Sequence, residues 1–196
     1  MIEFPDYKKA TNAAYELLIQ YEGKLPVIDV FSIALFYPRV RIHTYSEIAE
    51  KMGIDYCTFL KKYASSEHGF TFYDRTKNGY IIFFNERKDE PTIRFTIAHE
   101  LGHIALKHEK ECGLTNREAN CFARNLLCPV QISDGFGVQT IQDYVNCFGI
   151  SEPMAEATIS CRKSDEYYIT RENYNKFNDV VYCYFSGYTL AELYGY

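Results

Sequence analysis

The sequence predicts an α+β protein in which helices predominate and a small antiparallel sheet packs on one of them. Several stretches carry apolar residues at helical spacing, as Ala14, Leu17 and Leu18 do in the first of them. Two runs rich in aromatic and β-branched residues, 70–73 and 80–84, flank an Asn-Gly step that favours a hairpin. Because helices and strands are segregated along the chain, α+β is the expected class.

Each expected element has a local signal. Helices are expected over residues 10–21, 26–35, 46–63, 91–108, 116–127, 140–147 and 152–162. Gly23 ends the first helix, and Gly53 interrupts the third. Pro91 suits a first helical turn, Gly113 suits the exit of that helix, and Pro129 stops the next one. Strands are expected over residues 40–43, 70–73, 80–84 and 180–184.

Length and composition bound the class of protein. The 196 residues suit one domain over residues 1–162, with a Tyr-rich C-terminal extension over 163–196 packed on it. A net charge of -5 argues against a broad basic face for nucleic acid. No apolar run approaches the roughly 18 residues of a membrane span, and the acidic start lacks the apolar core of a signal peptide. A cytoplasmic protein with no membrane partner is therefore expected.

The cysteines agree with that compartment. There are 7 of them, an odd number, and no pair has C-x-x-C spacing. A disulfide framework or a four-cysteine zinc site is not expected, and reduced, mostly buried thiols are.

A chemical motif lies in the expected helix 91–108. His99 and His103 are four residues apart and would share one helix face, where two neutral imidazoles suit tetrahedral zinc. Glu100 follows the first histidine and would reach a water rather than the metal, as a general base does. The apolar flanks place this helix in a core, which argues against two surface histidines. The pattern predicts a zinc-dependent hydrolase.

Spacing alone does not fix the third zinc ligand. A glutamate six residues after the second histidine would be Glu109, but Leu106 replaces the glycine that this pattern needs. Cys112 and Cys121 could ligate, although nothing in their spacing favours them.

Glu118, on the next expected helix, is the remaining candidate. If the two helices pack side by side, its carboxylate returns toward the histidines. The same residue also ends Thr115-Asn116-Arg117-Glu118, which matches a capping box. Spacing alone does not choose between ligand and cap.

Two blocks of sequence resemble a known family. Residues 94–106 read RFTIAHELGHIAL, and residues 118–129 contain EANCFA followed by LLCP. Together they resemble the ImmA/IrrE family of zinc metallo-endopeptidases, and weaker agreement extends over about residues 15–162. Cys128 stands where the family commonly has methionine, and Asn116 where it often has an acidic residue. The tail after Arg162 matches no pattern of the family.

The resemblance carries implications residue by residue. It implies that His99, His103 and Glu118 ligate one zinc ion and that Glu100 is the catalytic base. It implies a small gluzincin-like fold, and a protein substrate that is a helix-turn-helix transcriptional repressor, often encoded beside the protease on mobile elements or in stress-response loci. The residues of this chain carry no trace of that substrate.

Two other functions stay open at this point. Residues 46–55 resemble the first half of a DNA-binding helix-turn-helix, but the following segment offers only Lys61 and Lys62 as basic side chains. A metal-binding regulatory module without proteolytic activity would keep the same ligands, although the presence of Glu100 argues against it.

Substrate binding is expected at the strand before the motif helix. Residues 81–85 are predicted to be a sheet edge that lines the cleft and binds an extended segment as an added strand.

Overall fold

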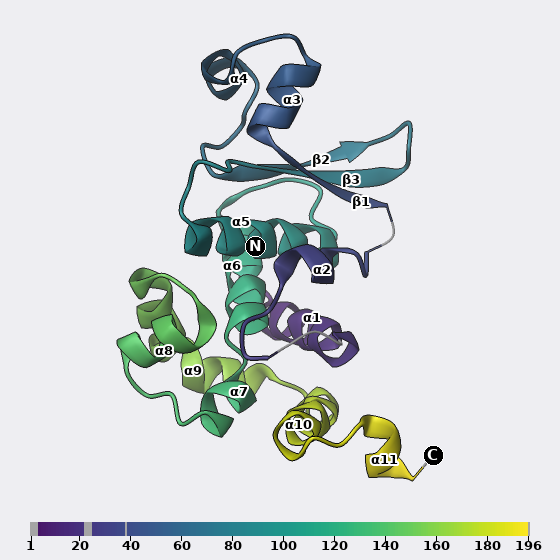
Figure 1. Ribbon diagram of the computed structural model, residues 1–196, viewed down its shortest axis with the longest axis vertical. Coiled ribbons are helices and arrows are strands. Elements are labelled where there is room, and N and C mark those ends of the chain that lie inside the picture. Colours follow the sequence, from purple (N-terminus) through teal and green to yellow (C-terminus); the bar gives the residue numbers. More distant parts are fainter. Residues whose placement is uncertain (1–3, 22–24, 38, 196) are drawn as a thin grey trace.

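A three-stranded mixed sheet lies between two groups of helices (Figure 1). The computed structural model describes residues 4–21, 25–37 and 39–195. Its strands are β1 (Val40–Thr44), β2 (Gly69–Asp74) and β3 (Gly79–Phe84), in the order β1-β3-β2. The predicted hairpin is confirmed, since β2 and β3 pair antiparallel. The expectation of a purely antiparallel sheet is wrong, because β1 pairs parallel to β3 after a helical crossover.

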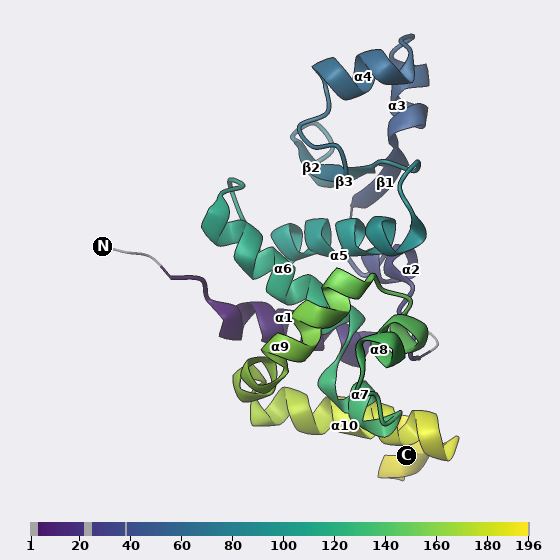
Figure 2. The ribbon, with the colours of Figure 1, turned by 90° about the vertical axis from the view of Figure 1, so that its left-hand side faces the viewer.

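The two faces of β3 serve different cores. Ile82 and Phe84 belong to the main core, on the side of the sheet that faces most of the helices. Phe83 points to the opposite face, as strand alternation requires, and packs with Tyr45 and Phe59. Those two residues belong to α3 (Tyr45–Lys51) and α4 (Tyr56–Lys62), which cover that face (Figure 2). The segment with a helix-turn-helix likeness is thus packed on the sheet.

The motif helix α5 (Glu90–Leu106) covers the other face of the sheet and contacts β2 and β3. Two glycines allow close approach on its two sides. A Cβ on Gly69 of β2 would lie 2.4 Å from Thr96 Cγ2, and a Cβ on Gly102 would lie 3.1 Å from Ala119 Cα. Ala119 belongs to α6 (Gly113–Leu127), so α5 is held closely between β2 and α6.

The short helix α2 (Val30–Ala34) packs beside α5, where Phe31 meets Phe84 of β3. The other helices lie on the side of α6 that faces away from the sheet (Figure 2). They are α1 (Tyr7–Gln20), α7 (Val130–Gly135), α8 (Ile141–Phe148), α9 (Glu152–Tyr168), α10 (Arg171–Ser186) and α11 (Leu190–Tyr194). Among the described helices, none is long and apolar enough to cross a membrane.

The strand predicted for residues 180–184 is wrong, because this segment is the C-terminal part of α10. Its local composition favours a strand, but Asn173, Phe177 and Val181 are buried at four-residue intervals, the spacing of one helix face. Tertiary packing of this face therefore determines that residues 180–184 are helical, against their local strand propensity. Phe177 meets Tyr15 of α1 edge to face at 5.3 Å between ring centroids.

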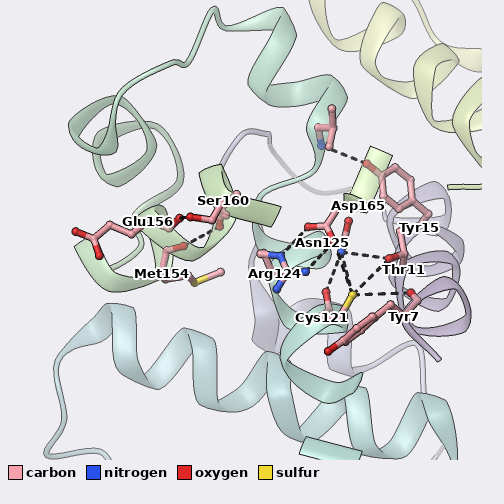
Figure 3. A network of polar contacts seen from close by, with 12 residues as sticks. Tyr7, Thr11, Tyr15, Cys121, Arg124, Asn125, Met154, Glu156, Ser160 and Asp165 are labelled. Atoms are coloured by element: carbon pink, nitrogen blue, oxygen red, sulfur yellow. Dashed lines mark hydrogen bonds and ion pairs between the residues drawn. The ribbon is translucent and has the colours of Figure 1, made fainter. Parts of the chain in front are cut away.

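A buried polar network joins α1, α6 and α9 behind the motif helix (Figure 3). Arg124 of α6 forms a two-point ion pair with Asp165 of α9, with N–O distances of 2.6 and 2.7 Å. Cys121 Sγ lies 3.4 Å from Thr11 Oγ1. Desolvation opposes the charged form of Arg124, but Asp165 outweighs it and raises the pKa of the guanidinium. Arg124 is thus a charged structural residue whose guanidinium is paired with Asp165.

The C-terminal segment continues this packing. The boundary expected at residue 162 falls inside α9. The amide of Asn173 on α10 donates to Asn12 Oδ1 of α1 at 3.0 Å. We propose that residues 163–196 belong to the same folded unit as the preceding chain.

Candidate active site

The two motif histidines face each other on α5. His99 Nε2 and His103 Nε2 lie 3.0 Å apart, and their rings meet at 68°. Helical spacing places the two side chains on one face. Two nitrogens bound to one tetrahedral zinc at roughly 2.0–2.1 Å would be about 3.3 Å apart. The separation of the two Nε2 atoms is therefore close to that of two ligands of one metal ion.

The outer nitrogens of these rings have their own partners. His99 Nδ1 lies 2.8 Å from Asn120 Oδ1, and His103 Nδ1 lies 2.9 Å from His108 Nδ1. Asn120 Oδ1 only accepts, so His99 Nδ1 carries the hydrogen and Nε2 keeps a lone pair. Burial lowers the pKa of both rings, to about 3 for His103, where the neighbouring His99 and His108 add to the effect. Both imidazoles are neutral at pH 7, which is the form that binds metal.

Glu100 is buried beside the first strand of the hairpin. Its side chain is held by Thr71 of β2, whose hydroxyl donates to Oε2 at 2.8 Å. Burial raises the pKa of this carboxyl to about 7, and the bond from Thr71 opposes the rise. A carboxyl group in that range exchanges a proton readily near neutral pH, as a general base must.

Glu118 lies on α6 and, among the described residues, is linked to His103 through His108. Its Oε2 lies 2.8 Å from His108 Nε2, and its Oε1 accepts from the Asp6 backbone N–H at 2.6 Å. The capping alternative is wrong, because α6 begins at Gly113 with Cys112 as its N-cap and Thr115 as its third residue. Glu118 is therefore free of the cap role that its spacing suggested.

The other candidate ligands do not join the pair. Cys112 is exposed at the start of α6, and Cys121 faces Thr11 and Asp165 in the scaffold network. Glu109 is exposed. Within the part of the chain that the structure describes, no three His, Cys, Asp or Glu side chains form a group that could hold a metal ion. The structure thus brings His99 and His103 together and leaves the third donor one side chain away.

A cavity of about 700 Å³ opens beside these residues. His99 and Glu100 line it from α5, Gly69 lines it from the start of β2, and His68 lines it from the residue before that strand. Its other walls come from α6 and from the N-terminal part of α9. The set that forms those walls is Asn116, Asn120, Arg124, Ser151, Pro153, Met154 and Ala157. The cavity is large enough for several residues of a peptide, and Glu100 is part of its lining.

The strand at the cavity is β2 rather than the strand predicted from sequence. Residues 81–85 were expected to form a sheet edge, but β3 is central and pairs with both β1 and β2. The Asn85 backbone N–H donates to His68 O at 2.8 Å, which makes that pair a hydrogen-bonded one. Because such pairs alternate in an antiparallel ladder, the backbone groups of Gly69, Thr71 and Tyr73 point outward from the sheet. The outer edge of β2 is thus the edge available at the site.

The sequence did not indicate a role for three residues that the structure places in the site, Asn120, His108 and Thr71. Asn120 lies within the EANCFA block, so its place opposite His99 could have been inferred from the resemblance. Nothing in the spacing of the sequence assigned a role to His108 or to Thr71. Asn116 lines the cavity, and its buried Oδ1 has no hydrogen-bond partner among the described residues.

A helix with paired histidines and a buried glutamate, beside a cavity and an edge strand, is the arrangement of a metallopeptidase-like site. The family model described as Peptidase_M78, IrrE N-terminal-like domain, matches residues 49–136, just under half of the chain. The match contains the motif helix and Glu118 and confirms the relationship to the ImmA/IrrE family. This segment is therefore similar to the IrrE N-terminal-like domain of a peptidase family, and a peptidase acts on a protein or peptide. None of the curated proteins compared with the chain matches it.

Proposed function

We propose that this protein is a zinc-dependent endopeptidase in which Glu100 is the general base. The observation that carries the proposal is the position of Glu100, buried at 4% exposure yet lining the cavity beside the facing nitrogens of His99 and His103. Buried carboxyl groups with a raised pKa are typical of functional sites.

His99, His103 and Glu118 would hold the metal. The two imidazoles suit it because their outer nitrogens are engaged and their Nε2 atoms converge. Glu118 is supported by the family resemblance and by its contact with His108, which itself contacts His103. When bound, zinc polarises a carbonyl oxygen and lowers the pKa of a water molecule. A sheet packed on the helix that carries two of these ligands is also the arrangement expected of a small gluzincin.

Glu100 moves the proton in this proposal. Its carboxylate accepts a proton from the attacking water and delivers it to the amine nitrogen of the leaving peptide. The Thr71 hydroxyl holds Oε2 and so orients the carboxylate for this exchange. A base with a pKa near 7 can both accept and return a proton at neutral pH.

The substrate would bind as an extended segment along β2. The outward backbone groups of Gly69, Thr71 and Tyr73 can pair with an added strand. Thr71 contacts Glu100, so a segment paired at this position would bring its own peptide bonds to the base. Apolar side chains of the segment would meet Phe95, Pro153 and Met154 in the cavity.

A helix-turn-helix repressor is the proposed substrate, on the basis of the family resemblance. The test uses a repressor encoded beside this chain, incubated with the zinc-loaded protein and analysed by intact-mass spectrometry. We expect two fragments from a single cut with the wild type and none with Glu100→Gln. A library of proteome-derived peptides, digested in parallel, separates the two claims. Cleaved peptides with an intact repressor would overturn the substrate, and no cleavage of either would overturn the activity.

A regulatory module without proteolysis is the second candidate. It is favoured by one observation, which is that Glu118 bonds to His108 rather than converging with the two histidines. Such a module would bind zinc as the wild type does and leave both the repressor and the peptide library intact.

A further inference from the structure

His108 lies where it can control the orientation of a metal ligand. The motif helix ends at Leu106, and Lys107 adopts a left-handed conformation with φ 58°. This turn folds the chain back over the helix, so the His108 backbone N–H donates to His103 O at 3.0 Å. The His108 ring then stands against the His103 ring, with centroids 4.9 Å apart.

His108 links Glu118 to His103 through two hydrogen bonds, one at each of its ring nitrogens. Its Nε2 lies 2.8 Å from the carboxylate of Glu118, and its Nδ1 lies 2.9 Å from His103 Nδ1. A carboxylate only accepts, so His108 donates to it from Nε2–H, and the tautomer whose single hydrogen lies there keeps a lone pair on Nδ1. That lone pair accepts from His103 Nδ1–H, which leaves the lone pair of His103 on Nε2, the atom that faces His99.

Burial strengthens the hydrogen bonds that join Glu118, His108 and His103. The side chains of His108 and Glu118 are only 7% and 12% exposed. Water therefore competes little for these bonds, and an unpaired nitrogen there would be costly. Asn120 fixes the orientation of the His99 ring in the same way, by accepting from His99 Nδ1–H. The Nε2 atoms of both rings therefore face each other.

We propose that His108 is a positioning residue, which takes its orientation from Glu118 and fixes the His103 ring with its lone pair on Nε2. This proposal rests on the proposed function in that His103 serves as a metal ligand. His108 does not itself bind the metal. Residues that hold a histidine ligand in this way typically change metal affinity by about 10–100-fold when they are removed.

The first test measures the hydrogen position directly in the metal-free wild type. Long-range ¹H–¹⁵N spectra distinguish a hydrogen on Nδ1 from one on Nε2 of a histidine ring. We expect His103 to carry its hydrogen on Nδ1, and a spectrum with the hydrogen on Nε2 would overturn the proposal. This experiment needs no variant and no substrate.

The second test measures zinc affinity by competition with a chromophoric chelator. We expect His108→Ala to bind zinc about 10–100-fold more weakly than the wild type. His108→Gln, which keeps one acceptor and one donor, should recover part of the loss. His43→Ala is the control, since His43 lies on β1 and pairs with Glu47.

Two results of the second test would contradict the proposal. Unchanged affinity in His108→Ala would remove the positioning role. Complete loss of zinc, equal to that of His103→Ala, would make His108 a ligand instead. If the wild type binds no zinc, the proposed function fails, while the spectrum of His103 still decides the hydrogen position. If His108→Ala does not fold, that spectrum also decides.

Discussion

The hydroxyl of Thr71 donates a hydrogen bond of 2.8 Å to Oε2 of Glu100, and this bond joins the edge strand to the motif helix. It has two consequences for function. It fixes one carboxylate oxygen of Glu100, and it places that carboxylate beside the backbone edge proposed to bind substrate.

Removal of this hydroxyl should affect catalysis more than binding. Thr71→Val keeps the β-branched shape of the strand residue but leaves Glu100 Oε2 without its donor. We expect kcat to fall about tenfold, on the order of 1.4 kcal/mol, with KM changed little. Steady-state kinetics on a cleaved peptide measure this, and Thr71→Ser should restore the rate. A wild-type kcat in Thr71→Val would show that the bond has no catalytic role.

The approach of β2 to α5 depends on Gly69. A side chain there would place Cβ 2.4 Å from Thr96 Cγ2 and 2.8 Å from Phe83 O, so Gly69→Ala must displace the strand. We expect a loss of about 1–3 kcal/mol in the free energy of unfolding, measured with denaturant, together with slower cleavage. Gly113→Ala is the matched control, because a Cβ at that position would meet no described atom within 4 Å apart from its chain neighbours and its own helix backbone. Equal stability of the two variants would contradict this packing.

Arg94 anchors the motif helix at its first turns. Its guanidinium is buried and donates to Phe148 O and Gly149 O at 2.6 Å each and to Ile28 O at 3.1 Å. Arg94→Met leaves these carbonyl groups without a donor and should lower the free energy of unfolding by about 3 kcal/mol. The exposed Arg75→Met should stay within about 0.5 kcal/mol of the wild type. Urea titrations of both variants compare them, and a similarly small loss in Arg94→Met would contradict the anchoring role.

Zinc binding by the variants separates ligands from their neighbours. His99→Ala and His103→Ala should each abolish tight binding. Glu118→Gln keeps an acceptor for His108 but removes the charge, so a ligand role predicts a larger loss of affinity than His108→Ala causes. Elemental analysis and chelator competition give both results. Wild-type affinity in Glu118→Gln would leave Glu118 only as the partner of His108.

Local sequence signals predicted the elements that depend on local chemistry. The spacing of His99 and His103 predicts their shared face, and the Asn78-Gly79 step predicts the β2–β3 hairpin, because turn and helix geometry are set within a few residues. Most expected helices are present, although 46–63 is divided at Gly53 into α3 and α4.

Tertiary relationships were less predictable. The central position of β3 follows from the parallel pairing of β1, which no local signal reveals. The helix at 180–184 follows from packing on α1, which overrides the strand propensity of its residues. Thr71 reaches Glu100 only because Gly69 admits a close approach between strand and helix. His108 reaches His103 only because Lys107 turns the chain back.

The central claim is that Glu100 acts as the base of a zinc-dependent peptide hydrolysis. The most direct measurement compares cleavage by wild type and Glu100→Gln, each loaded with zinc and matched for zinc content and thermal stability. Glutamine keeps the shape of the side chain but cannot take a proton. We expect the variant to cleave about 10²–10⁴-fold more slowly, and treatment with a zinc chelator to stop the wild type. Equal rates in the two proteins, or full activity of the wild type after zinc removal, would contradict the account.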